Sequence, residues 1–115
     1  MERSDRYELD PRAAAQHVRD GALLLDVREP DECEEARVAG ARHIPLGEID
    51  HRLDELPRDR EIVVICRSGR RSAKAQDAME AAGFGPVANL AGGIIAWEKE
   101  GLPVTRGPGA MGRGR

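Results

Sequence analysis

Residues 62–73 have the sequence IVVICRSGRRSA, and this stretch decides how the rest of the chain is interpreted. Its first four residues are β-branched and aliphatic, which predicts a buried strand over residues 62–65. Cys66 follows that strand directly, and from Ser72 onward an alanine-rich run up to Ala82 predicts a helix. The sequence therefore places a thiol between the end of a strand and the start of a helix.

The segment between Cys66 and Ser72 favours a negative charge on sulfur. It consists of Arg67, Ser68, Gly69, Arg70 and Arg71. Unpaired N–H groups and the positive end of the helix dipole meet at a helix start, and glycine allows the positive φ of an anion-binding nest. These groups and the guanidinium charges predict a thiol pKa below that of free cysteine. We therefore predict that Cys66 is a nucleophile rather than an inert core cysteine.

The loop CRSGRRS at residues 66–72 resembles the active-site loop of the rhodanese family, the sulfurtransferases that carry sulfur as a cysteine persulfide. Further motifs follow the family order: LLLDVREPDE at 23–32, GARHIPL at 40–46, RLDELP at 52–57, AGF at 82–84 and LAGGIIAW at 90–97. The resemblance covers about residues 7–104. It implies the α/β rhodanese-like fold, a five-stranded, mostly parallel sheet flanked by helices on both faces.

The resemblance also implies a reaction and roles for the loop. Cys66 would take sulfane sulfur from thiosulfate or a persulfide donor and pass it to cyanide, a thiol or a protein thiol. The N–H groups of residues 67–72 would hold the thiolate and then the persulfide. Arg71 matches the family's loop-closing basic position and Arg67 its second position, whereas Arg70 matches a variable position and is expected to face solvent.

The remaining sequence alternates strand and helix patterns, which independently predicts an α/β domain with a mostly parallel sheet. Asp10 and a following proline predict a helix start, and the helix would end near Gly21. Residues 22–27 predict a second buried strand. Asp26 and Arg28 fall at its carboxyl end, the edge where ligands gather in such sheets. We expect both in supporting roles, with Asp26 accepting loop N–H groups and Arg28 paired with an acid.

Weaker patterns fill the rest of the domain. We expect a short acidic helix over 30–37, a strand over 41–44, one or two short helices over 46–56, a strand over 87–90, and a helix over 94–100 anchored by Trp97. The chain departs from the family at Cys33, where an aromatic is common, and at residues 36–39, ARVA in place of Gly-His-Ile-Pro. Substrate preference therefore stays open. Cys33 is expected to be a small core residue, with a resolving thiol as the alternative.

Length and composition limit the remaining possibilities. The 115 residues fit one domain, expected over 7–104, with a frayed amino terminus (1–6) and a disordered Gly-rich tail (105–115). The net charge of −3 gives no sign of a nucleic-acid surface. Two cysteines suit a reducing compartment, and without a signal peptide or apolar span we expect a cytoplasmic monomer that binds no membrane. The three histidines match no metal template, so no metal or cofactor is expected.

Two other functions use the same residues. Cysteine phosphatases and arsenate reductases also cradle an oxyanion in a cysteine loop, but their signature places Arg after five intervening residues. Here the residue at that position is Ser72, and Arg71 comes one residue too early. A shorter loop suits a sulfur atom better than a phosphoryl group. A non-catalytic rhodanese-like binding module is the third possibility, and the presence of Cys66 argues against it.

Overall fold

Five parallel strands form one sheet, in the order β1-β5-β4-β2-β3, in a computed structural model that describes residues 5–108. The strands are β1 (Glu8–Leu9), β2 (Leu23–Asp26), β3 (Arg42–His43), β4 (Ile62–Ile65) and β5 (Val87–Leu90). The central β4 and its neighbour β5 are buried along their whole length, which explains why the sequence of β4 is aliphatic without alternation. The predicted fold class is confirmed, and the sheet is entirely rather than mostly parallel.

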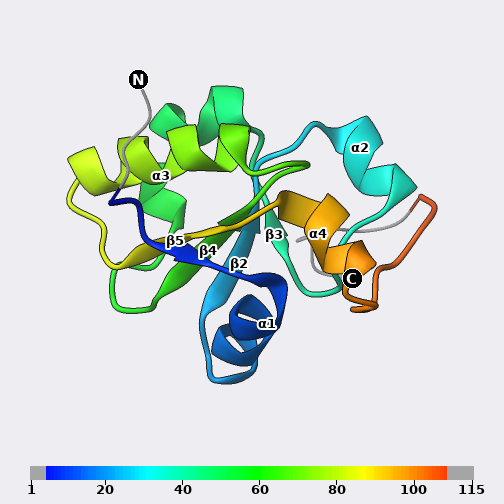
Figure 1. Ribbon diagram of the computed structural model, residues 1–115. Coiled ribbons are helices and arrows are strands. Elements are labelled where there is room, and N and C mark those ends of the chain that lie inside the picture. The colour runs from blue at the N-terminus through cyan, green and yellow to red at the C-terminus, as the bar shows by residue number, and fades with distance from the viewer. Residues whose placement is uncertain (1–4, 109–115) are drawn as a thin grey trace.

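Helices cover both faces of this sheet (Figure 1). They are α1 (Pro11–Arg19), α2 (Pro30–Glu35), α3 (Arg70–Ala81) and α4 (Gly93–Lys99), with 3-10 helices η1 (Leu46–His51) and η2 (Leu53–Glu55). One core cluster joins α1 and α4 to one face of the sheet and includes the side chain of Trp97, as expected. The second cluster joins α3 and η1 to the other face and includes Met79 and Ile49. In Figure 1 α3 lies above the sheet and α1 below it.

Local sequence signals explain where most helices begin and end. Asp10 caps α1, because its carboxylate accepts the N–H of Ala13 at 2.8 Å, and Gly21 follows the helix with a φ of 116°. The start of α3 differs from the prediction, because the helix begins at Arg70 rather than near Ser72. Gly69 precedes it with a φ of 105°, a conformation that turns the chain directly into the helix. The loop after Cys66 is therefore only three residues long.

Residues just outside the expected domain, 7–104, contact it at both ends. Helix α2 ends at Glu35, and Arg37 just beyond it forms an antiparallel bridge with Thr105. The N–H of Gly107 donates to the carbonyl of Glu34 at 2.7 Å. Arg6 donates to the side chain of Gln76 at 2.8 Å. Composition alone could not reveal these long-range partners. Residues 1–4 and 109–115 of the predicted flexible ends lie outside the described residues.

Within residues 5–108, no helix has the length and apolar character needed to cross a membrane.

Candidate active site

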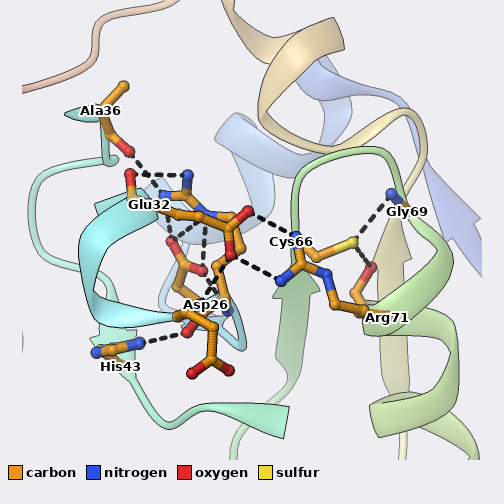
Figure 2. A network of polar contacts seen from close by, with 10 residues as sticks. Asp26, Glu32, Ala36, His43, Cys66, Gly69 and Arg71 are labelled. Atoms are coloured by element: carbon orange, nitrogen blue, oxygen red, sulfur yellow. Dashed lines mark hydrogen bonds and ion pairs between the residues drawn. The ribbon is translucent and has the colours of Figure 1, made fainter. Parts of the chain in front are cut away.

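Cys66 lies where β4 ends, with its sulfur turned toward the start of α3. Its Sγ is 3.0 Å from the backbone nitrogen of Gly69, which donates to it, and 3.3 Å from the hydroxyl oxygen of Ser72 (Figure 2). Only 1% of the residue is exposed. The sequence predicted this placement between strand and helix, and the short loop brings the donors onto the sulfur.

The surroundings of Cys66 favour its ionised form. Burial raises the pKa of the thiol, but hydrogen bonds to the sulfur outweigh that effect and leave the pKa below its ordinary value. The bonds come from the Ser72 hydroxyl and from the N–H groups of Ser72, Gly69 and Ser68. Guanidinium charge, which the sequence suggested as a further cause, is not among these leading contributions. The site can therefore hold a thiolate through backbone N–H groups and the Ser72 hydroxyl.

The first turn of α4 forms hydrogen bonds with the backbone of Cys66 and of the loop that follows it. The N–H of Ile94 donates to the carbonyl of Cys66 at 2.9 Å, and that of Ile95 donates to the carbonyl of Arg67 at 3.2 Å. Gly93 makes this approach possible, because a Cβ added there would lie 2.3 Å from the Arg67 carbonyl oxygen. Of the Gly-Gly pair seen in the sequence, Gly93 therefore permits the close packing of α4 against the loop that follows Cys66.

Asn89, a residue that the sequence analysis did not select, fixes the loop from β5. It is 1% exposed, and its Nδ2 donates to the carbonyl of Gly69 at 3.0 Å. Its Oδ1 lies 2.5 Å from the hydroxyl oxygen of Ser72. The only sequence signal was a polar side chain within an otherwise apolar buried strand, VANL. Asn89 thus positions both side-chain and backbone donors of Cys66.

The three loop arginines have different environments. Arg71 forms a two-pronged ion pair with Glu32 of α2, with Nη–Oε distances of 2.7 and 2.8 Å. The side chains of Arg67 and Arg70 are exposed, and neither has a hydrogen-bonding or ionic partner among residues 5–108. The sequence analysis did not identify Glu32, because only the fold brings its side chain to Arg71.

Asp26 and Arg28 form a buried ion pair at the carboxyl end of β2. The Nη2 of Arg28 lies 2.8 Å from Asp26 Oδ2, and the backbone N–H of Arg28 donates to Asp26 Oδ1 at 3.0 Å. Arg28 also donates to the carbonyl of Ala36 at 2.7 Å, and its own carbonyl lies 2.6 Å from Nε2 of His43 (Figure 2). The pair therefore ties α2 and β3 to the edge of the sheet at which Cys66 also lies.

Comparisons with known proteins agree with this architecture. A family model described as a rhodanese-like domain matches residues 10–100. The chain belongs to the rhodanese-like family.

Relatives of this rhodanese-like chain include a sulfurtransferase from Allochromatium vinosum, 40% identical over 99 residues, which cover 84% of this chain and 92% of the relative. The putative sulfurtransferase YtwF of Bacillus subtilis is 42% identical over 80 residues, covering 70% and 77%. Among solved structures, a rhodanese-related protein from Thermoplasma volcanium superposes with a TM-score of 0.81 at 31% identity, covering 86% of this chain and 97% of the other. The predicted family is confirmed.

Cys33 is the second of the two cysteines in the chain. The residue is 4% exposed, and burial together with the charge of Asp26 raises the pKa of its thiol to about 12. A thiol with that pKa has almost no thiolate at neutral pH, which favours the core role over the resolving role. Among the described residues 5–108, no group of three or more His, Cys, Asp or Glu side chains is placed to hold a metal ion.

Proposed function

We propose that this rhodanese-like chain is a sulfurtransferase that carries sulfane sulfur as a persulfide on Cys66. One observation supports this most: the Cys66 sulfur accepts hydrogen bonds at the start of α3 in surroundings that lower its pKa. A lowered pKa increases the fraction of thiolate, which is the nucleophilic form of cysteine. Relatives named sulfurtransferases favour this chemistry over other uses of a thiolate. In one of them the match covers 92% of the relative's own length.

In the first half-reaction, the Cys66 thiolate attacks the outer sulfur of thiosulfate. A sulfur–sulfur bond forms to Sγ, the sulfur–sulfur bond of thiosulfate breaks, and sulfite leaves with the bonding electron pair. The exposed guanidinium groups of Arg67 and Arg70 attract the dianionic donor to the loop. The N–H groups of Ser68 and Gly69 then face the negative persulfide.

In the second half-reaction, cyanide or an acceptor thiolate attacks the outer sulfur of the Cys66 persulfide. The new bond forms to the acceptor, the sulfur–sulfur bond breaks, and its electron pair returns to Sγ as the thiolate. A persulfide donor would enter the same cycle in place of thiosulfate. Asp26 and Arg28 do not contact the sulfur in this scheme, and they keep α2 and β2 in place.

Intact-mass measurement tests this proposal. The protein should gain the mass of one sulfur atom with thiosulfate and lose it with cyanide. Cys66→Ser should abolish both changes, and Cys33→Ser is the matched control because it removes the other thiol. Sulfur loading that persists in Cys66→Ser would overturn the assignment.

A cysteine phosphatase or arsenate reductase is the competing enzyme class. Both Nη atoms of Arg71 donate hydrogen bonds to the Glu32 carboxylate. The loop between Cys66 and α3 has only three residues. That short loop favours a sulfur atom over a tetrahedral oxyanion. Release of phosphate from an aryl phosphate, lost in Cys66→Ser, would favour the competing class.

A further inference from the structure

Glu32 bridges α2 to the first turn of α3 beside the nucleophile. Its two carboxylate oxygens lie 2.7 and 2.8 Å from the two Nη atoms of Arg71. Oε1 also accepts the backbone N–H of Glu29 at 2.9 Å, within a capping box at the start of α2. Figure 2 shows the Arg71 side chain extending past Cys66 to reach Glu32. Glu32 is therefore held from its own helix while it fixes the guanidinium in one orientation.

The ion pair also changes the charge that the sulfur experiences. Arg71 interacts electrostatically with the Cys66 thiolate, but the contact with Glu32 is its largest interaction. The same contact holds the pKa of Glu32 at about 2, so both partners are ionised at neutral pH. Arg71 and Glu32 together are neutral. Of the three loop arginines, only Arg67 and Arg70 lack an acidic partner among residues 5–108.

We infer that Glu32 is a positioning residue of this site: it holds Arg71 beside Cys66, cancels its charge, and thereby limits the attraction of the loop for anionic sulfur donors. The inference rests on the proposed sulfurtransferase function for its substrate. Arg71 keeps unused N–H donors, because Glu32 engages one hydrogen on each Nη, and these can meet a donor's oxygen atoms. The chain thus presents Arg71 as a directional hydrogen-bond donor without its full positive charge.

Glu32→Gln removes the charge and preserves the shape, since glutamine can still accept a hydrogen bond from Arg71. The uncompensated guanidinium should attract anions, and at several ångströms through partly aqueous surroundings one charge changes such attraction by about three- to tenfold. We expect the KM for thiosulfate to fall by about that factor, with kcat nearly unchanged because donor and transition state gain alike.

A pair of alkylating reagents measures the same charge without sulfur transfer. Iodoacetate is anionic and iodoacetamide is neutral, and both react with the thiolate of Cys66. Their rate ratio therefore reports the electrostatic potential at the sulfur independently of the thiol pKa. In Glu32→Gln the ratio of iodoacetate to iodoacetamide rates should rise by about three- to tenfold at low salt, and the gain should shrink as salt is added.

Two further comparisons separate charge from fold stability. Glu34→Gln is the matched control, because it makes the same change on the exposed side of α2 where the side chain has no partner among residues 5–108. It should leave both the rate ratio and KM unchanged. Arg71→Gln should raise KM, because Glu32 then repels the donor. Adding Glu32→Gln to Arg71→Gln should recover part of that loss.

The outcomes are distinct. A Glu32→Gln variant that matches Glu34→Gln in rate ratio, or a double variant no better than Arg71→Gln, overturns the inference even if the parent loads sulfur normally. A Glu32→Gln variant that only melts at lower temperature shows a purely structural role and also overturns it. A parent that fails to load sulfur overturns the proposed function, while the alkylation ratio still decides whether Glu32 controls the charge at Cys66.

Discussion

The Ser72 hydroxyl has one hydrogen and two acceptors nearby, the sulfur of Cys66 at 3.3 Å and Oδ1 of Asn89 at 2.5 Å. With a neutral thiol, the shorter contact to Asn89 takes that hydrogen. A thiolate is the stronger acceptor, because hydrogen bonds to charged groups exceed those to neutral ones. Ionisation of Cys66 therefore favours rotation of the hydroxyl toward sulfur, where it stabilises the charged form.

Ser72→Ala should raise the pKa of Cys66, because the Ser72 hydroxyl makes the largest of the contributions that lower it. The iodoacetamide rate at neutral pH should fall several-fold, and the midpoint of its pH profile should move upward. Ser68→Ala is the control, since Ser68 acts through its backbone N–H, which alanine retains. Equal pH profiles for Ser72→Ala and the parent would contradict this role of the hydroxyl.

Cys33→Ser should keep most of the sulfur-loading activity, because the Cys33 thiol stays protonated with a pKa of about 12. Its free energy of unfolding should fall by about 1 kcal/mol, since a hydroxyl replaces a buried thiol. Intact-mass loading and urea unfolding measure the two effects. Loss of loading by a variant that still folds would instead make Cys33 a participant in the transfer.

At the scale of elements, the approach of α4 to the loop after Cys66 depends on Gly93. Its φ is 61°, and an added Cβ would lie 2.3 Å from the Arg67 carbonyl oxygen and 2.6 Å from that of Cys66. Backbone atoms cannot move aside as a flexible side chain can, so α4 and the loop must separate. The N–H groups of Ile94 and Ile95 would then lose their carbonyl partners.

Gly93→Ala should therefore lower the free energy of unfolding by about 3 kcal/mol and reduce the alkylation rate of Cys66. Gly47→Ala is the matched control, because no atom lies within 4 Å of the added Cβ and its backbone is not left-handed. Chemical denaturation compares the two variants. A Gly93→Ala protein as stable as Gly47→Ala would show that the loop tolerates the displacement.

Elements with a strong local pattern could be predicted from the sequence, and elements set by geometry could not. β4 and β5 have the predicted bounds because their apolar runs are unbroken apart from Asn89. The predicted start of α3 was two residues or more too late. Serine is a common helix-capping residue, which favoured Ser72, but the cap is Gly69 in a left-handed conformation. In the candidate site, the placement of Cys66 between a strand and a helix could be predicted because these residues are contiguous.

Glu32 and Asn89 could not be predicted, because they reach the loop from other elements. Glu32 is 39 residues from Arg71 in the sequence, and Asn89 is 17 residues from Ser72. Acidic residues are common in α2, and no local pattern distinguishes the one that faces α3. The same limit applies to Thr105, because its bridge partner Arg37 is distant from it in the sequence.

For the whole molecule, the Glu32–Arg71 pair makes the free energy of unfolding depend on the pH of the solution. The pKa of Glu32 is about 2 in the folded chain against an ordinary 4.5, so the folded state favours the ionised form. A carboxyl group with a lowered pKa stabilises the fold fully above its unfolded pKa and loses this contribution as pH falls. The affected window runs from about pH 4.5 down to about pH 2.

The melting temperature of the parent should therefore fall more steeply across that window than the melting temperature of Glu32→Gln, which has no carboxyl group to protonate there. Scanning calorimetry at several pH values measures both slopes. Glu34→Gln should follow the parent, because Glu34 has no side-chain partner among residues 5–108. Parallel curves for the parent and Glu32→Gln would show that the ion pair adds nothing to acid stability.

The near-complete enclosure of Cys66 also means that the shape of a molecule decides whether it can reach the sulfur. With 1% of the residue exposed, a reagent or substrate must present its reacting atom on a narrow end to touch the sulfur. Slender molecules such as thiosulfate, cyanide or hydrogen peroxide satisfy that condition, whereas branched dyes and folded protein surfaces do not. Under the proposed function, a macromolecular acceptor would therefore have to offer its thiol on a thin, protruding segment.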